Sequence, residues 1–295
     1  IIAVRDGGDR NGHVYNYVLE CHKTGKIPLI IRNSGRAWKK PGRYGRLIGR
    51  SVGEKKLAEA IRRELSGPAP VIPDQVKVVN SGINSLKVFS KETAEQFNES
   101  EMRDAVRIAA KFDLPVIVHA NGRNPVKIAV EAGCKSIEHG FFMGKENLKR
   151  MADKGTFWVP TAVTMKSYGE KLEEKSPEAL VSKKNLEHQL IQMSMARELG
   201  VRMAAGTDAG SLGVHHGNAV SEEIRLFMEA GFSLEGAISC AAANAAELLG
   251  LKQLGRLTPG KDATFIAVKG DIDNLKENLN KIDYLYIRGS RFLSQ

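Results

Sequence analysis

The octapeptide PVIVHANG, residues 115–122, runs from a proline through three β-branched residues into His119 and then into an Asn-Gly pair. β-branched residues are typical of buried strands, and Asn-Gly is typical of the turn that ends one. The same arrangement recurs where KSIEHG reaches His139 and where RMAAGTDAG reaches Asp208. Three expected strands therefore end in a side chain that can bind a metal or carry a proton.

Seven apolar segments of four to six residues have this strand-like character. They are residues 1–4, 28–31, 76–79, 115–119, 136–139, 157–161 and 202–207. Helical patterns lie between them, for example at 100–112, 124–133, 147–155 and 188–200. The alternation indicates parallel βα units and an α/β fold, and it favours a (β/α)8 TIM barrel over a doubly wound sheet. No G-x-G-x-x-G motif follows any segment, which weakens the dinucleotide-binding alternative.

Seven strands are one short of a barrel, and we expect the first strand to lie before Ile1. The pattern changes after ANAAELLGL, residues 243–251, because residues 255–271 and 282–292 read as short alternating strands joined by turns. Two or three such strands do not form a stable sheet alone. We therefore expect a barrel in residues 1–256, carrying strands 2–8, and part of a small β-sandwich in residues 257–295.

The composition excludes several classes of protein. The 295 residues are 42% hydrophobic, but they contain no run of 18 apolar residues and no signal peptide, so a membrane protein is not expected. The three cysteines are odd in number and form no C-x-x-C pair, which favours a reduced, cytoplasmic protein. A homo-oligomer is also expected.

The net charge of +10 is concentrated in one stretch. Residues 32–63 hold eleven Lys and Arg against two Glu. A surface that binds nucleic acid needs aromatic side chains to stack on bases, and the basic loop at 32–50 offers only Trp38 and Tyr44. We therefore expect a small-molecule partner and no nucleic acid.

The carboxyl ends of barrel strands converge on one mouth, where His119, His139 and Asp208 would all lie. Imidazole and carboxylate groups are ordinary zinc ligands. Each residue alone has a simpler explanation, as a hydrogen-bonded structural histidine or as a helix N-cap. Their shared position favours a site. The fourth candidate residue of this site is Lys77 in DQVKVVNSG, and Lys87 in SLKVF is the alternative candidate.

The motifs VKVVNSG, VIVHANG, SIEHG, GTDAG and GVHHGNAVSEE together resemble those of the amidohydrolase superfamily, over nearly the whole chain. The imidazolonepropionase-like and prolidase-like members are the most similar. The resemblance implies that Lys77 is carboxylated and bridges two divalent ions, most simply Zn²⁺. It also implies that His119 and His139 bind one ion, and that Asp208 binds the other and acts as the catalytic general base.

One departure from that family concerns its first two ligands, an H-x-H pair at the end of strand one. The present sequence contains no H-x-H; its only adjacent pair is His215–His216, where the family has a substrate contact. Either the pair precedes Ile1 or the first metal site is lost. The two missing structural elements favour the first explanation.

The basic stretch RNSGRAWKKPGRYGRLIGR, residues 32–50, is rich in Gly and Pro turn signals and is expected to be a shaped loop over the mouth. Arg36, Arg43 and Tyr44 are candidates for gripping a substrate carboxylate, since arginine favours two-pronged carboxylate contacts. A solvated loop is the alternative. We also expect His216, together with Asn218 and Glu222, near the pocket, although Glu222 could equally face solvent.

These residues predict a metal-activated hydroxide that cleaves an amide-type C–N bond, in a dipeptide, an N-acyl amino acid or a cyclic amide. The same nucleophile attacks esters, so a lactone or phosphotriester hydrolase remains an alternative. A second alternative is a barrel that has lost its first metal site and has no catalytic activity.

Overall fold

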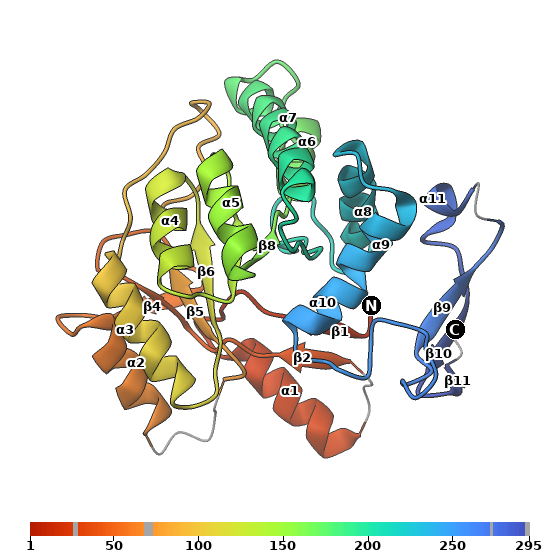
Figure 1. Cartoon of the computed structure of the whole chain (residues 1–295), viewed down its shortest axis with the longest axis horizontal. Coiled ribbons are helices and arrows are strands. Elements are labelled where there is room, and N and C mark those ends of the chain that lie inside the picture. The colour runs from red at the N-terminus through yellow and green to blue at the C-terminus, as the bar shows by residue number, and fades with distance from the viewer. Residues whose placement is uncertain (26–28, 68–72, 272–273, 293–295) are drawn as a thin grey trace.

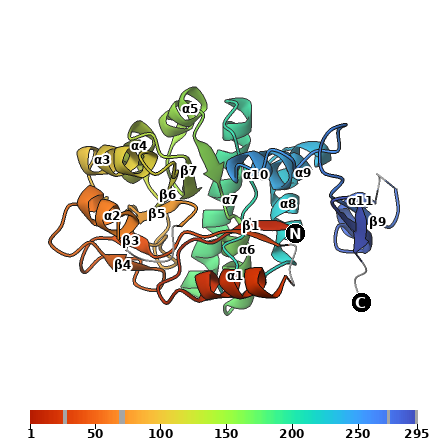
Figure 2. The same ribbon diagram turned by 90° about the horizontal axis from the view of Figure 1, so that it is seen from below.

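The computed structural model of the chain describes residues 1–25, 29–67, 73–271 and 274–292. The predicted strand at 28–31 begins at Pro28, which lies outside these ranges. A parallel sheet and a surrounding layer of helices make up most of the described structure, with a small separate sheet at the C-terminal end (Figures 1 and 2).

The main sheet has six parallel strands in the order β4-β3-β5-β6-β7-β8. Its strands are β3 (Ala37–Lys39), β4 (Gly49–Ser51), β5 (Val76–Val79), β6 (Val116–Ala120), β7 (Ser136–His139) and β8 (Phe157–Val159). A second parallel pair consists of β1 (Ala3–Arg5) and β2 (Ile30–Arg32). The predicted strand at 202–207 is reduced to an isolated bridge between Met203 and Trp158 of β8.

Helices cover the outer face of this sheet, and Figure 1 shows α3, α4 and α5 side by side across β5 and β6. The helices are α1 (His13–Thr24), α2 (Leu57–Leu65), α3 (Glu99–Ala110), α4 (Arg123–Glu131), α5 (Lys145–Lys154), α6 (Val163–Lys171), α7 (Pro177–Glu198), α8 (Ala219–Glu229), α9 (Leu234–Ala241), α10 (Ala243–Leu248) and α11 (Leu275–Asn278). The helix predicted at 188–200 is the second half of the longer α7. Within the described ranges, no helix combines the length and the apolar character that crossing a membrane requires.

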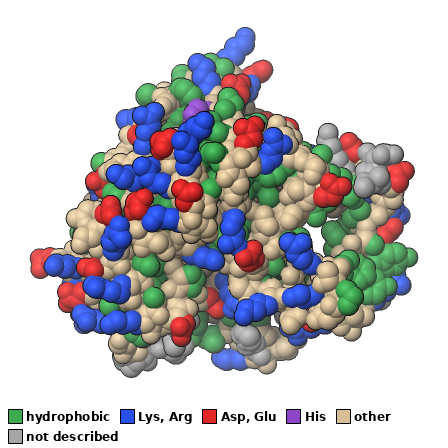
Figure 3. Space-filling model, in the orientation of Figure 1, with side chains coloured by type: hydrophobic (Ala, Val, Ile, Leu, Met, Phe, Trp, Pro, Cys, Tyr) green, Lys and Arg blue, Asp and Glu red, His purple; other side chains and the backbone are tan. Residues whose placement is uncertain are grey.

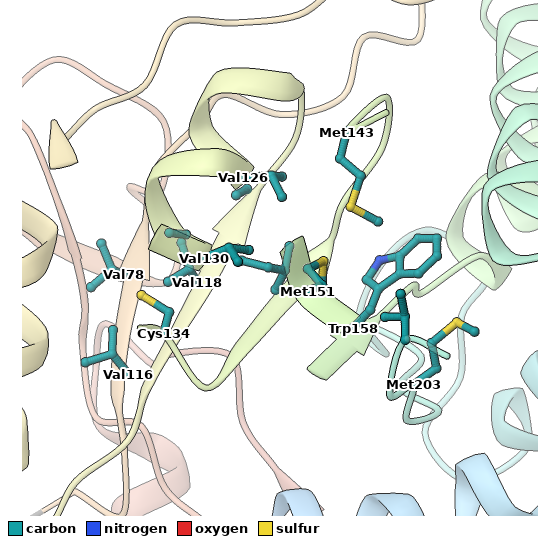
Figure 4. Packing of buried hydrophobic residues seen from close by; sticks show 14 of the residues in the cluster. Val78, Val116, Val118, Val126, Val130, Cys134, Met143, Met151, Trp158 and Met203 are labelled. Carbon is teal, nitrogen blue, oxygen red and sulfur yellow. The ribbon is translucent and has the colours of Figure 1, made fainter. Parts of the chain in front are cut away.

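The core explains why these strands are apolar. Val78, Val116 and Val118 point outward from β5 and β6, and they pack with Val126 and Val130 of α4 (Figure 4). Burying one such side chain contributes roughly 1.5–3 kcal/mol to stability. Because side chains alternate along a strand, the residues between these valines face the interior of the barrel.

The basic stretch at 32–50 was predicted to be a loop, but it contains β3 and the first two residues of β4. Trp38 is buried in β3, and the guanidinium of Arg50 lies 4.1 Å from its ring. Gly49 permits the close pairing of the two strands, since a Cβ at this position would lie 2.3 Å from the carbonyl oxygen of Ala37. The turn residues predicted a loop, whereas the buried Ala-Trp-Lys segment adds strands to the sheet.

The C-terminal residues form an antiparallel sheet of β9 (Phe265–Val268), β10 (Ile282–Ile287) and β11 (Ser290–Phe292), in the order β11-β10-β9. The rings of Phe265 and Tyr286 stack across β9 and β10 with centroids 4.7 Å apart. Hydrophobic side chains gather on the surface of this sheet, at the right of Figure 3. The predicted short strands are confirmed.

Candidate active site

Two histidines meet at the carboxyl ends of neighbouring strands. His119 lies near the end of β6, and the next residue, Ala120, pairs with His139 at the end of β7. Their ring centroids are 4.7 Å apart, with the ring planes inclined by 67°. The structure therefore brings together two of the predicted ligands.

Each imidazole is oriented through one of its ring nitrogens. Nε2 of His119 lies 3.0 Å from the carbonyl oxygen of Gly82, and Nδ1 of His139 lies 2.7 Å from the hydroxyl of Thr161. This arrangement leaves Nδ1 of His119 and Nε2 of His139 for a metal. A hydrogen bond on the non-coordinating nitrogen is the usual way in which proteins orient a metal-binding histidine.

Burial favours the neutral form of both rings. It lowers the pKa of His119 well below the ordinary value, with a further contribution from nearby His139, and it also lowers the pKa of His139. Metal binding requires the neutral imidazole, so the environment favours the ligating form.

His139 ends β7, Thr161 follows β8 and Asp208 follows the bridge at Met203, and all three have left-handed backbone conformations that are uncommon outside glycine. The φ angles are 69° at His139, 50° at Thr161 and 50° at Asp208. Such conformations cost about 1–3 kcal/mol each and concentrate at functional sites, where the surrounding structure holds them. They turn the chain sharply where each segment reaches the mouth.

Lys77 lies in β5 with 3% of its surface exposed, whereas Lys87 is exposed in the loop that follows. Burial lowers the pKa of Lys77, and the carboxylate of Glu138 opposes that shift. Of the two candidate lysines, the structure therefore places Lys77 in the barrel interior. The direction of the pKa shift favours the neutral amine, which is the form that reacts with carbon dioxide to give a carbamate.

A buried ion pair beside Lys77 was not predicted. Nη2 of Arg5 lies 2.8 Å from both carboxylate oxygens of Glu138, and the hydroxyl of Ser136 donates to the same carboxylate at 2.5 Å. Burial alone would raise the pKa of Glu138, but Arg5 and Lys77 hold it below its usual value. Period-two alternation in SIEH, with Ser136 and Glu138 on one face, was the available signal.

Asp208 is exposed at the mouth, and its Oδ2 accepts a hydrogen bond from Ser211 at 3.0 Å. Its charge acts on Lys77, His139 and Tyr44, so it lies in the same neighbourhood. Across the part of the chain that the structure describes, no three His, Cys, Asp or Glu side chains are gathered closely enough to hold a metal. The paired imidazoles and the carboxylate fit a divalent ion in chemical type, and Lys77 becomes a ligand only as a carbamate.

The substrate-binding candidates divide into two groups. The ring of Tyr44 lies 5.1 Å from that of His119, and burial raises its pKa. Arg43 is exposed and donates to the carbonyl of Ala94 at 2.7 Å, while Arg36 is exposed and donates to the carbonyl of Arg10 at 2.9 Å. The structure thus brings Tyr44 to the histidines and ties both arginines to backbone carbonyls.

The segment after Asp208 leads into α8. His216 and Asn218 are exposed just before this helix. Glu222 is within ion-pair distance of Arg225 at 2.8 Å and of Lys166 at 3.3 Å. Its carboxylate is therefore engaged by cations of α6 and α8.

Comparison with known proteins gives concordant results. A model of the amidohydrolase family matches residues 46–291. Ochratoxinase of Aspergillus niger is 29% identical over 224 residues, which is 74% of this chain and 44% of that protein. Imidazolonepropionase of Paracoccus denitrificans is 29% identical over 175 residues, which is 57% of this chain and 38% of that protein. The chain thus spans less than half the length of these two curated relatives.

A crystal structure of a Xaa-Pro dipeptidase with bound methionine in the active site superimposes with a TM-score of 0.82 at 25% identity. The superposition covers 100% of this chain and 75% of that one. The predicted TIM-barrel fold and the small C-terminal sheet are confirmed by this likeness.

Proposed function

This chain belongs to the amidohydrolase family, as its motifs predicted, and from that premise we propose that it is a metal-dependent hydrolase of amide-type C–N bonds. The observation that carries the proposal is the close approach of the imidazoles of His119 and His139 at the mouth of the barrel, where burial lowers the pKa of both rings. One relative, Xaa-Pro dipeptidase, is by its name a peptidase, and this supports the choice of bond.

The proposed ligands are His119, His139, Asp208 and a carbamate formed on Lys77, with zinc as the metal. Imidazole and carboxylate oxygen are the donor types that zinc accepts. Arg5 neutralises the carboxylate of Glu138. A negative carbamate on Lys77 would therefore not face a second unpaired negative charge in the interior.

When bound, a divalent ion supplies a hydroxide nucleophile at neutral pH and polarises the scissile carbonyl. Asp208 is the proposed general base, accepting the proton of the attacking water and passing it to the leaving nitrogen. The raised pKa of Tyr44 keeps its phenol protonated at neutral pH, so it can donate a hydrogen bond to the substrate.

We further propose a small-molecule substrate that carries a carboxylate, bound by Arg36, Arg43, Tyr44 and His216. We also propose that the protein is cytoplasmic, forms a homo-oligomer and does not bind nucleic acid. Its proposed units are a barrel at 1–256 and a C-terminal unit at 257–295. The free cysteines Cys21, Cys134 and Cys240 support a reducing compartment.

The proposal is tested by zinc binding and turnover together. Wild type, His119→Ala, His139→Ala and Asp208→Asn are compared on an N-acyl amino acid, a lactone and a phosphotriester. Because the sequence has no H-x-H, we expect at most one tightly bound ion per chain. Exposed His13, at the start of α1, provides the control variant His13→Ala.

Loss of zinc binding in both histidine variants, with unchanged binding in His13→Ala, is the expected result. Faster turnover of the lactone or the phosphotriester than of the amide would reassign the reaction. Zinc binding without turnover of any substrate would favour the inactive barrel, which the absence of H-x-H makes the second candidate.

A further inference from the structure

Helix α7 presents a buried polar face to the ends of the strands. Ser182, Asn185 and Gln189 are fully buried, and Gln192 is 3% exposed. The buried face of a surface helix is ordinarily apolar. Buried amides are tolerated where they find hydrogen-bond partners, so the partners of this face indicate its role.

Gln189 bonds to the carboxyl ends of two neighbouring strand segments. Its Nε2 donates to the carbonyl of His139, the last residue of β7, at 2.6 Å and lies 3.2 Å from the carbonyl of Pro160, directly after β8. The indole of Trp158 donates to the same His139 carbonyl at 2.9 Å. One backbone carbonyl thus receives two side-chain donors inside the protein.

These two hydrogen bonds hold the backbone of His139, which is in the left-handed conformation. With φ at 69°, His139 needs surrounding contacts to keep its peptide in place. Gln189 and Trp158 fix the carbonyl side of that residue. On the other side, Pro160 precedes Thr161, whose hydroxyl contacts the His139 ring. Gln189 therefore contacts both the backbone of His139 and the segment that orients its imidazole.

We propose that Gln189 is a positioning residue that holds the imidazole of His139 in its metal-binding orientation. The inference rests on the proposed function, because it requires His139 to be a ligand. Gln189 touches neither substrate nor metal in this scheme and acts through His139 alone. Loss of its donor would let the peptide after β7 relax and would misplace one ligand.

The test compares Gln189→Met with Asn185→Leu in the full chain. Both positions are fully buried on the same face of α7, and each substitution removes the amide while keeping a side chain of similar volume. Asn185 donates to the carbonyl of Ser85 and to the sulfur of Met165. Gln192 is unsuitable as a control because its Nε2 donates to Oε1 of Gln189 at 3.0 Å. Zinc affinity is measured with Zn²⁺ alone, in competition with a chromophoric chelator.

Gln189→Met is expected to lose about 10- to 100-fold in zinc affinity, the usual effect of removing a group that orients a ligand. Asn185→Leu is expected to keep the wild-type affinity. In metal-free protein labelled on histidine, NMR signals of the His139 ring should shift in Gln189→Met, while those of the exposed His13 at the start of α1 stay in place. If Gln189→Met does not fold, the shorter amide of Gln189→Asn provides the same comparison.

Equal losses in Gln189→Met and Asn185→Leu would show that the helix merely stabilises the fold, and would overturn the inference. A normal affinity in Gln189→Met would also overturn it. His139→Ala in the same titration separates the two proposals. A loss there without a loss in Gln189→Met defeats the positioning role alone, whereas normal binding in His139→Ala defeats the metal site and the positioning role together.

Discussion

Arg5 of β1 and Glu138 of β7 are 133 residues apart in sequence, yet a guanidinium nitrogen of Arg5 lies 2.8 Å from both carboxylate oxygens of Glu138. Their side chains are 12% and 11% exposed. Such a pair has lost most of its hydration, so each charge depends on the other. The pair connects the small β1–β2 sheet to the main sheet at Glu138, the residue that precedes His139 in β7.

Replacing Arg5 with methionine is expected to lower the free energy of unfolding by about 3–5 kcal/mol, because the Glu138 carboxylate stays buried without its cation. Urea unfolding measures the change. The control is Arg107→Met, which removes an exposed ion pair with Asp104 and is expected to cost about 0–1 kcal/mol. An equally small effect in Arg5→Met would show that Glu138 is hydrated in the folded protein.

Lys77→Ala is expected to abolish metal-dependent turnover and to weaken zinc binding, because it removes the amine on which the carbamate forms. Lys87→Ala is the matched control, since Lys87 is exposed and its backbone amide, not its side chain, bonds to Ser85. Zinc titration and amide hydrolysis are measured for both variants. The opposite pattern, with Lys87→Ala inactive, would transfer the role to Lys87.

The sequence predicts those site residues whose position depends only on the residue pattern of a single strand. In β6, alternation places Val118 against the helices, so the next residue, His119, must face the interior. A turn signal after it marks the carboxyl end. Local pattern was therefore sufficient to put His119 and His139 at one end of the barrel, whereas the preference for Lys77 over Lys87 came from the resemblance to the amidohydrolase superfamily.

Contacts that depend on closure of the fold were not predictable in this way. Nothing near Arg5 indicates that Glu138 is its partner, because the contact exists only after distant strands are brought together. Gln189 was missed because its helix was recognised from apolar spacing, whereas the buried face of α7 is polar. The strands β3 and β4 were missed because glycine and proline signals dominate residues 32–50.

Glu223 of α8 is expected to make stability depend on pH. Its carboxylate is buried and accepts hydrogen bonds from the backbone amides of Ala162 and Val163. Burial raises its pKa from 4.5 to about 8, and Glu222 adds to the shift. The folded protein then holds this proton more tightly than the unfolded chain. The stabilising effect is complete below the ordinary pKa and is lost as the pH rises towards the folded-state value.

Unfolding free energies of wild type and Glu223→Gln, measured between about pH 5 and pH 8, check this sign. The stability of wild type relative to the variant is expected to fall as the pH rises. A difference that does not change with pH would mean that the two backbone hydrogen bonds keep Glu223 ionised despite its burial.

The last prediction concerns the arginines of the basic stretch. If Arg36 and Arg43 bind a substrate carboxylate, their removal should affect acidic substrates selectively. A charged hydrogen bond is worth roughly 1.5–3 kcal/mol, or about 10- to 150-fold in kcat/KM. Arg43 is next in sequence to Tyr44, whose ring lies beside His119. We therefore expect Arg43→Ala to lose more than Arg36→Ala on an N-acyl amino acid, and both to hydrolyse its neutral amide at nearly the wild-type rate. Equal losses on the charged and neutral substrates would instead show that the hydrogen bonds to the carbonyls of Ala94 and Arg10 are the main role of these side chains.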